Sequence, residues 1–383
     1  GPYAIQPGGT FKDIILSLRT GSGTPVPNAD ITLVLPAGFI YADGGSGSRI
    51  FRTGTDGRVT ISGVKGPSAP GSHNMTATYR SKTATARLAI VGVVGTISGF
   101  KLPHDLAFSQ DGAHVYVCNA SNDTISVIKN SSQEIVNTIR VGDYPAAIAS
   151  SRDGNYMFVC NRNSDTVSVI SIADQKVTDT IAVAGQPLGI DTSPDGSYIY
   201  VSTYGSNAVA VIEIASLKVI ESIAVGRQPY GIKSSLDGSK VFVANNQGNT
   251  VSVINIATME VVETIAVGSI PGDITTSPDG TRIFVSNNSS NTMSVINTLS
   301  LTVTETIAVA QRPAGVTSSP DGAYVFVCNY FSPGLSVIDA TTLRMTMEIS
   351  VGQGSYKVAC SPDGSRIYVC KAEFDTVSII TIG

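Results

Sequence analysis

The sequence predicts an all-β protein, and three observations lead to this fold class. Residues 93–383 carry a repeat of fixed period, residues 3–92 consist of short alternating segments separated by Gly and Pro, and the composition favours strands. Charged residues make up 14% of the 383 residues, hydrophobic residues make up 42%, and Trp is absent. Low charge with abundant Val, Ile, Thr, Ser and Gly fits a soluble all-β chain and does not fit a disordered or helical one.

The repeat is marked by the turn Ser-Pro-Asp-Gly, which occurs unchanged at 193–196, 277–280, 319–322 and 361–364. Altered copies lie at 109–112, 151–154 and 235–238. The seven turn aspartates are spaced 42 residues apart, and they are Asp111, Asp153, Asp195, Asp237, Asp279, Asp321 and Asp363. Pro at the second position and Gly at the fourth are typical of a type I turn followed by a left-handed residue, which closes a β-hairpin. A period of about 40 with several short strands per unit predicts a seven-bladed β-propeller.

One unit shows four strands clearly. In the second repeat we expect an inner strand at 145–150, a second at 156–161, a third at 166–172 and a fourth at 176–183. The second and third strands are apolar on both faces. Strands that are covered on both sides lose the alternation of a half-exposed sheet. The blades are therefore expected to pack face to face.

The second strands share a motif that is more specific than the period alone. They read VYVCN at 115–119, VFVAN at 241–245, IFVSN at 283–287 and VFVCN at 325–329, and TVSVI recurs at 166–170 and 250–254. In seven copies, these segments resemble the YVTN-repeat β-propellers of archaeal and bacterial surface-layer and secreted proteins. The resemblance covers residues 93–383 and implies an extracytoplasmic protein, either secreted or at the cell surface.

The ring is expected to close with a strand from before the first repeat. The last repeat ends after its third strand, DTVSIITI at 375–382. Aligning Pro103 with Pro187 places residues 93–97 opposite the fourth strand at 177–181. We therefore expect residues 93–98 to complete the seventh blade, because closure removes two open sheet edges.

Residues 3–92 form a separate predicted domain, because they carry no copy of the repeat. Apolar and polar residues alternate at 15–18 and at 75–79, which predicts strands of a β-sandwich. The segments GTPVPNADITL (23–33), TDGRVTISGV (55–64) and GSHNMTATY (71–79) resemble bacterial immunoglobulin-like modules of the invasin and intimin type. That resemblance implies a stalk or spacer, with further immunoglobulin-like modules in the native chain.

Charge and cysteine content limit the partners and the chemistry. The chain has 25 basic and 29 acidic residues, a net charge of −4 and no Lys/Arg run, so nucleic acid is not an expected partner. No apolar stretch approaches the roughly 20 residues that a membrane helix needs.

Cys118, Cys160, Cys328 and Cys370 each lie seven residues after a turn aspartate, and Cys360 has no partner at metal-ligand spacing. We expect free thiols, since equivalent positions in neighbouring blades lie beyond disulfide reach.

Candidate functional residues are found where one repeat departs from the others. In six repeats a proline begins the inner strand, and small residues dominate the next two positions. The residues that depart from this rule are His104, Asp105, Tyr230, Asp273, Tyr356 and Lys357. Blades seven and one are neighbours in a closed ring, so Lys357, Asp105 and His104 are expected to converge at the channel. A structural ion pair lining the channel and a binding site are both open interpretations.

The loops between fourth and first strands and between second and third strands are expected to share one rim, around the channel mouth. Loops on a rigid scaffold often carry binding residues. The prominent side chains in these loops are Tyr144, Arg162, Tyr204, Arg227, Arg312, Tyr330, Phe331, Glu373 and Phe374. Tyr, Phe and Arg anchor interfaces and stack on sugar rings. The pair Tyr330-Phe331 differs most from the equivalent positions of the other repeats. An apolar pair at an exposed loop tip indicates contact with a ligand. The alternative is that these are ordinary solvated loop residues.

Enzyme signatures are weak. The chain has three His residues and no G-x-S-x-G elbow, HExxH motif or P-loop. Asp105, Asp273, Glu373 and His104 are the only available metal ligands near the channel, so we predict no catalytic residue, metal or cofactor. The sequence favours a non-enzymatic binding or adhesion module whose rim recognises a protein or a glycan. Two alternatives stay open: a lactonase or other hydrolase acting at the central channel, by fold analogy, and a structural surface-layer or assembly component.

Overall fold

The computed structural model describes residues 3–11, 14–90 and 92–381. The described residues form strands and one short 3-10 helix, η1 (Ala372–Phe374), so the all-β class is confirmed. The described residues leave out 1–2, 12–13, 91 and 382–383. Of these, 12–13 and 91 belong to the first predicted domain, and 382–383 belong to the second. The chain divides into two compact units, one of residues 1–94 with 380–383 and the other of residues 95–379. Among the described residues, no helix has the length and apolarity needed to cross a membrane.

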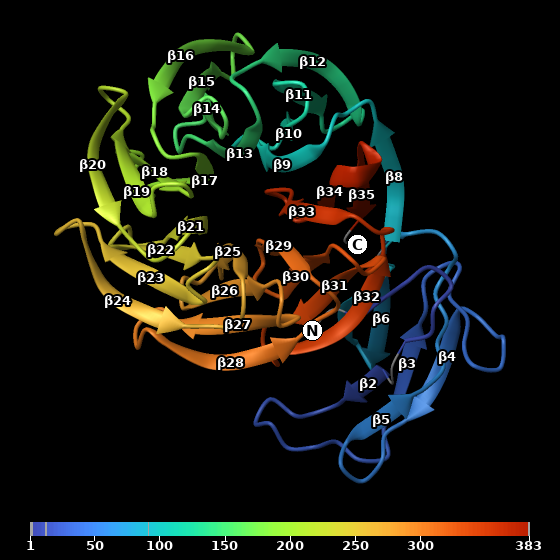
Figure 1. Ribbon diagram of the computed structural model, residues 1–383. Coiled ribbons are helices and arrows are strands. Elements are labelled where there is room, and N and C mark those ends of the chain that lie inside the picture. Colours follow the sequence, from blue (N-terminus) through green and yellow to red (C-terminus); the bar gives the residue numbers. More distant parts are fainter. Residues whose placement is uncertain (1–2, 12–13, 91, 382–383) are drawn as a thin grey trace. The chain divides into compact units, whose positions relative to one another are not determined.

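Seven four-stranded sheets in the described part of the chain form the blades of a propeller, and Figure 1 shows them in a closed ring. The innermost strands are β9 (Pro103–Phe108), β13 (Pro145–Ser150), β17 (Pro187–Thr192), β21 (Pro229–Ser234), β25 (Pro271–Thr276), β29 (Pro313–Ser318) and β33 (Ser355–Cys360). The second strands are β10 (His114–Asn119), β14 (Tyr156–Asn161), β18 (Tyr198–Thr203), β22 (Lys240–Asn245), β26 (Arg282–Asn287), β30 (Tyr324–Asn329) and β34 (Arg366–Lys371).

The two outer positions of each blade complete the sheets. The third strands are β11 (Thr124–Lys129), β15 (Thr166–Ser171), β19 (Ala208–Glu213), β23 (Thr250–Asn255), β27 (Thr292–Asn297), β31 (Gly334–Asp339) and β35 (Thr376–Thr381). The fourth strands are β12 (Glu134–Arg140), β16 (Lys176–Ala182), β20 (Lys218–Ala224), β24 (Glu260–Ala266), β28 (Thr302–Ala308), β32 (Arg344–Ser350) and β8 (Gly92–Ser98). We number the blades one to seven from β9 to β33.

Two strands of blade two end one residue earlier than the sequence predicted. The third strand ends at Ser171 instead of Ile172, and the fourth ends at Ala182 instead of Val183. The amide of Ile172 donates to Asn155 O at 2.9 Å, and that of Val183 donates to Asp165 O at 2.8 Å. These amides bond to loops, so the sheet ladder ends before them.

The Ser-Asp-Gly turns have the predicted geometry in all seven repeats. The turn glycine has φ between 68° and 76°, and its amide donates to the carbonyl of the turn serine at 2.8–3.1 Å. The serine hydroxyl also donates to the turn aspartate at 2.5–2.6 Å. The aspartate in turn accepts from the backbone amide two residues later, as Asp237 does from Ser239 at 3.0 Å. The turn is therefore stabilised by an internal network as well as by Pro and Gly.

The blades pack face to face, as the apolar second and third strands predicted. In the core between blades two and three, Phe158 and Val169 pack with Ile199 and Val201. All four side chains are almost completely buried. A single blade has apolar side chains on both faces, so each blade needs two neighbours to bury them.

The seventh blade has the strand order β33-β34-β35-β8, which confirms that the strand before the first repeat completes it. Figure 1 shows β8 beside β35. Ile97 of β8 packs on a core that joins Val377 and Ile379 of blade seven to Leu106 and Val117 of blade one. The ring is therefore closed by chain segments from both ends of the propeller.

The N-terminal unit contains two sheets in its described residues. One has the order β1-β7-β6-β3-β4, and the other pairs β2 with β5. The strands are β1 (Tyr3–Ile5), β2 (Ile14–Ser17), β3 (Asp30–Val34), β4 (Ser48–Arg52), β5 (Arg58–Ile61), β6 (Gly71–Tyr79) and β7 (Lys82–Ile90). Ile14 and Ile61 of the small sheet share one core with Leu33 and Met75 of the large sheet. This core stabilises the unit without any cysteine.

We predict that a charge on the inner face of β8 opens the ring. Ile97→Asp places a carboxylate against the core of blades one and seven, and it should lower the free energy of unfolding by about 2 kcal/mol. Thr96→Asp changes an exposed neighbour on the same strand and should alter the free energy of unfolding by less than about 0.5 kcal/mol. Urea unfolding of the two variants measures the difference, and equal midpoints would contradict closure through β8.

We predict that the turn aspartates make the protein sensitive to acid. The hydrogen bond from Ser235 lowers the pKa of Asp237 from its ordinary value of 3.8 to about 2. A carboxyl whose pKa is lower in the folded chain stabilises the fold above the ordinary pKa, and this stabilisation is lost as the pH falls from 3.8 to about 2. Similar bonds lower the pKa of Asp111, Asp153, Asp195, Asp279 and Asp363.

The measurement is the thermal unfolding midpoint between pH 7 and pH 2. Asp237→Asn should lower the midpoint by about 2 °C at pH 7, which corresponds to the roughly 1 kcal/mol of one hydrogen bond. The same variant should lose less stability than the wild type on acidification, because one titrating group is gone. Parallel curves for wild type and variant would contradict this origin of the acid sensitivity.

Candidate functional site

The inner strands enclose a central channel with a cavity of about 490 Å³. It is lined by the inner strands of all seven blades. Gly is frequent there because neighbouring inner strands approach closely: a Cβ on Gly189 would lie 2.1 Å from the carbonyl oxygen of Tyr230, and one on Gly231 would lie 2.6 Å from that of Gly272. Small residues at these positions are therefore a packing requirement, and the larger exceptions define the chemistry of the channel.

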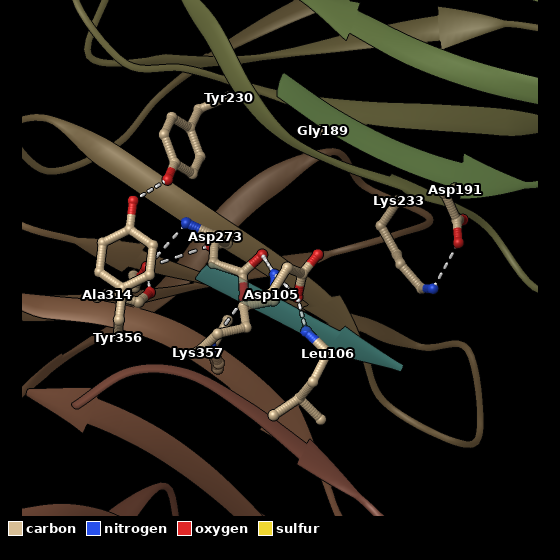
Figure 2. Close-up of polar contacts among 12 residues, drawn as sticks. Asp105, Leu106, Gly189, Asp191, Tyr230, Lys233, Asp273, Ala314, Tyr356 and Lys357 are labelled. Atoms are coloured by element: carbon tan, nitrogen blue, oxygen red, sulfur yellow. Dashed lines mark hydrogen bonds and ion pairs between the residues drawn. The ribbon is translucent and has the colours of Figure 1, made fainter. Parts of the chain in front are cut away.

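Three charged side chains from different blades meet in the channel, as Figure 2 shows. Lys357 Nζ lies 2.8 Å from Asp273 Oδ1 and 3.8 Å from Asp105 Oδ1. The predicted approach of Lys357 to Asp105 is present, but its shortest ion pair is with blade five, across the ring. Burial by itself lowers the pKa of Lys357, but the two carboxylates outweigh it and raise that pKa above the ordinary value. Lys357 is therefore a half-buried ammonium.

The two carboxylates also tie neighbouring blades together. Asp105 Oδ2 accepts from the amide of Ile148 in blade two at 3.1 Å, and Asp273 Oδ2 accepts from the amide of Val316 in blade six at 3.0 Å. Asp105 Oδ1 accepts from the amide of Leu106 at 2.8 Å. Burial raises the pKa of Asp105 to about 6, and Lys357 opposes this shift. Both aspartates thus have structural partners on both carboxylate oxygens.

A second ion pair, which the sequence analysis missed, lies further along the channel. Lys233 Nζ lies 2.7 Å from Asp191 Oδ1, and Asp191 Oδ2 accepts from the amide and hydroxyl of Ser234 at 2.8 and 2.6 Å. These two residues occupy the position four before the turn aspartate, where the other repeats have only Ala or Thr. The comparison of repeats that found Lys357 would also have found this pair.

Two tyrosines bridge the channel mouth. The hydroxyl groups of Tyr230 in β21 and Tyr356 in β33 are hydrogen-bonded to each other, and Figure 2 shows the two rings end to end. Burial raises the pKa of both phenols, so both are neutral at physiological pH. The bridge links blades four and seven.

His104 is not part of the charged cluster. Its Nδ1 lies 2.7 Å from the carbonyl oxygen of Ala146, which can only accept, so Nδ1 carries the proton. Its ring packs against Tyr144 and Tyr356. Burial lowers the pKa of His104 to about 4, and the imidazole is neutral at pH 7. His104 lines the same cavity as Asp105 and Lys357, as predicted, but its ring contacts are with the two tyrosines.

The two sets of rim loops lie side by side, as predicted. The amide of Arg162 donates to Tyr144 O at 2.9 Å, and that of Tyr330 donates to Arg312 O at 2.9 Å. Tyr144 and Arg312 have φ of 57° and 54°, a left-handed backbone that is unusual for bulky residues. Their amides are held by the side chains of Asp123 and Asn291 at 3.2 and 2.9 Å. These bonds fix the loops in place.

Eight rim side chains form one connected row, which we call the aromatic strip. Consecutive members have ring centroids 4.6–6.1 Å apart, or a guanidinium carbon 4.7–5.8 Å from a ring centroid. In order, the members are Tyr204, Arg162, Tyr144, His104, Tyr356, Tyr330, Phe331 and Arg312. The strip runs from blade three through blades two, one and seven to blade six.

The remaining predicted residues lie outside the strip. Arg227 is exposed, and Phe374 is exposed with Lys371 Nζ 4.8 Å from its ring centroid. Glu373 accepts a hydrogen bond from the hydroxyl of Tyr330 at 2.5 Å. In the part of the chain that the structure describes, Tyr230 is linked to the strip by its hydroxyl bond to Tyr356.

Cysteine and metal chemistry have little support in the described residues. All five cysteines are free thiols, as predicted, and burial raises the pKa of each one. They are therefore protonated and poor nucleophiles. Within the described ranges, no three His, Cys, Asp or Glu side chains are grouped as ligands for a metal ion.

Comparisons with known families agree with the propeller fold. The family described as YNCE-like beta-propeller matches residues 145–240 and 233–323, and the family described as lactonase, 7-bladed beta-propeller matches residues 75–180. No curated protein sequence matches the chain.

Two solved structures are similar over three quarters of the chain. Hydrazine synthase of Kuenenia stuttgartiensis has a TM-score of 0.68 and 23% identity, with 75% of this chain and 97% of that chain covered. The Cps50 (Swd1) beta-propeller domain of Myceliophteria thermophila has a TM-score of 0.67 and 12% identity, with 76% and 100% covered. At these identities the similarity concerns the fold alone. The family matches and the repeated four-stranded sheets together establish a seven-bladed β-propeller.

Proposed function

We propose that the propeller is a non-enzymatic recognition module that binds a protein or a glycan through its rim. The observation that carries this proposal is the aromatic strip, in which eight aromatic, imidazole and guanidinium side chains follow one another without a break. Tyr and Arg dominate the energetics of binding surfaces because they combine a large contact area with hydrogen-bonding groups. Seven ring–ring and guanidinium–ring contacts link the eight side chains in a single row.

The strip is also restrained before any ligand binds. Tyr144 and Tyr204 are half-buried against Arg162, and the hydroxyl of Tyr204 donates to Gln228 Oε1 at 2.9 Å. Side chains that are already held in place lose less conformational entropy on binding. Phe331 adds an apolar contact, since 51% of it is exposed and Arg312 covers one face of its ring.

The charged side chains of the channel are already bonded to other groups of the protein, which supports binding over catalysis. Asp105 and Asp273 each accept a backbone hydrogen bond from the next blade and pair with Lys357. A general base or nucleophile needs an atom directed at the substrate. The charged residues of the channel instead hold its wall together.

For the N-terminal unit, we propose an immunoglobulin-like spacer in an extracytoplasmic bacterial or archaeal protein. Two sheets that share one core support this proposal, together with the sequence segments that resemble invasin-type modules. The unit would present the propeller at the cell surface or in a secreted assembly. Further modules of this kind in the native chain follow from the same proposal.

A second candidate is a lactonase or related hydrolase that acts in the channel. It is favoured by the family match over residues 75–180. If a panel of lactones and esters were hydrolysed by the protein, and if Lys357→Met and Asp105→Asn abolished this activity without unfolding, the hydrolase would replace the recognition module. We expect no hydrolysis above the buffer rate.

We predict that binding to a glycan array or to cell surfaces depends on the strip. Phe331→Ala and Tyr144→Ala each remove one ring and should weaken binding about fivefold or more, at about 1 kcal/mol per lost aromatic contact. Leu236→Ala is the matched control, because this residue is 45% exposed in a turn at the opposite rim. Binding that is unchanged in both strip variants would place the site elsewhere. A protein that neither binds nor hydrolyses any probe would support a structural surface-layer or assembly component.

A further inference from the structure

The strip contains two guanidinium groups that have no acidic partner. Among the described residues, neither Arg162 nor Arg312 has a carboxylate oxygen within 4.0 Å. The Nε atom of Arg162 is buried and has no hydrogen-bond partner. The Arg162 guanidinium carbon lies 5.4 Å from the ring centroid of Tyr204 and 5.8 Å from that of Tyr144. An unpaired guanidinium held by two aromatic rings is ready to accept an anion.

Four carboxylates of the rim loops are hydrogen-bonded to neutral groups of the same rim. Glu373 is bound by the hydroxyl of Tyr330. Asp123 accepts from the amide of Tyr144, and Asp165 accepts from the amide of Gln186 at 2.7 Å. Asp143 is exposed and bonded to Asn163 at 3.3 Å. These hydrogen bonds leave the four carboxylates charged, but among the described residues none of them has an oxygen within 4.0 Å of either guanidinium, so the two arginines can still pair with a ligand.

Resting on the proposed function, we propose that the strip binds an acidic polysaccharide that carries uronic-acid residues. Its sugar rings lie against the aromatic faces, and its carboxylates pair with Arg162 and Arg312. A guanidinium binds a planar carboxylate through two parallel hydrogen bonds, which a lysine cannot do. The two arginines lie near the two ends of the strip, so a chain that spans it meets both.

The shape of the strip favours an extended sugar chain over a folded protein. The strip is a single row of side chains across five blades, and most of its members are only half-exposed. Protein interfaces instead have a compact, fully desolvated apolar centre. Its edges carry hydroxyl and amide groups, such as Tyr204 and Gln228, that can bond sugar hydroxyls. Stacked bases fit aromatic rows as well, but single-stranded nucleic acid also needs a basic groove that follows its phosphates, and the strip contributes two guanidinium groups near its ends.

The test uses the purified chain and titration calorimetry with oligogalacturonate as the probe. The fully methyl-esterified oligomer of the same length is the neutral control for the ligand. We expect the acid to bind at least tenfold more tightly than the ester, with an affinity that falls as salt is added. Arg162→Gln and Arg312→Gln should each weaken binding of the acid about tenfold, and Arg162→Lys should recover part of this loss.

The control variant is Arg152→Gln, which removes the same charge from an exposed turn at the opposite rim and should leave the affinity unchanged. Thermal unfolding of each variant shows whether the rim has kept its fold. Equal binding of acid and ester, or equal affinity of Arg162→Gln and wild type, would overturn the proposal. Tighter binding of a poly-glutamate peptide or a single-stranded DNA oligomer would also overturn it. If neutral glycans bind and Phe331→Ala loses them, the recognition module stands and only the acidic ligand is wrong.

Discussion

The structure depends on one constraint: the two middle strands of each blade are apolar on both faces and cannot be buried by a blade alone. Phe158 and Val169 of blade two reach full burial only against Ile199 and Val201 of blade three, and the same holds around the ring. An open arc would leave two such faces in water. Closure through β8 removes both faces and both free sheet edges, so the start and the end of the propeller depend on the same contact.

Most of this architecture could be predicted because short sequence segments determine it and these segments recur in every repeat. Each turn specifies its own backbone through Ser, Asp and Gly, and seven copies at a constant period determine the number of blades. The closing strand was also predictable. The last repeat has no fourth strand of its own, and the strand before the first repeat belongs to no other blade. The hydrogen bond from serine to aspartate was not foreseen, although it explains why Ser begins every copy.

The partners of the channel residues could not be predicted in the same way. Comparing repeats shows that Lys357 and Asp273 are unusual, but it gives no distance across a ring, and the sequence analysis paired Lys357 with its neighbour in blade one. Tyr230 and Tyr356 are 126 positions apart, and only the folded ring brings their hydroxyl groups together. Asp191 and Lys233 also depart from the other repeats, but they lie four positions before the turn aspartate and not directly after the inner-strand proline.

The departures from the repeat fall into two groups with different physical roles. Asp105, Asp273 and Lys357 satisfy one another and the backbone of adjacent blades, so they replace the close packing that Gly provides elsewhere. Arg162 and Arg312 stack on rings and leave their charges unpaired. A fold needs its buried charges neutralised, and it gains little from an unpaired guanidinium at its rim. This difference is the basis of the proposal that the rim arginines bind a ligand.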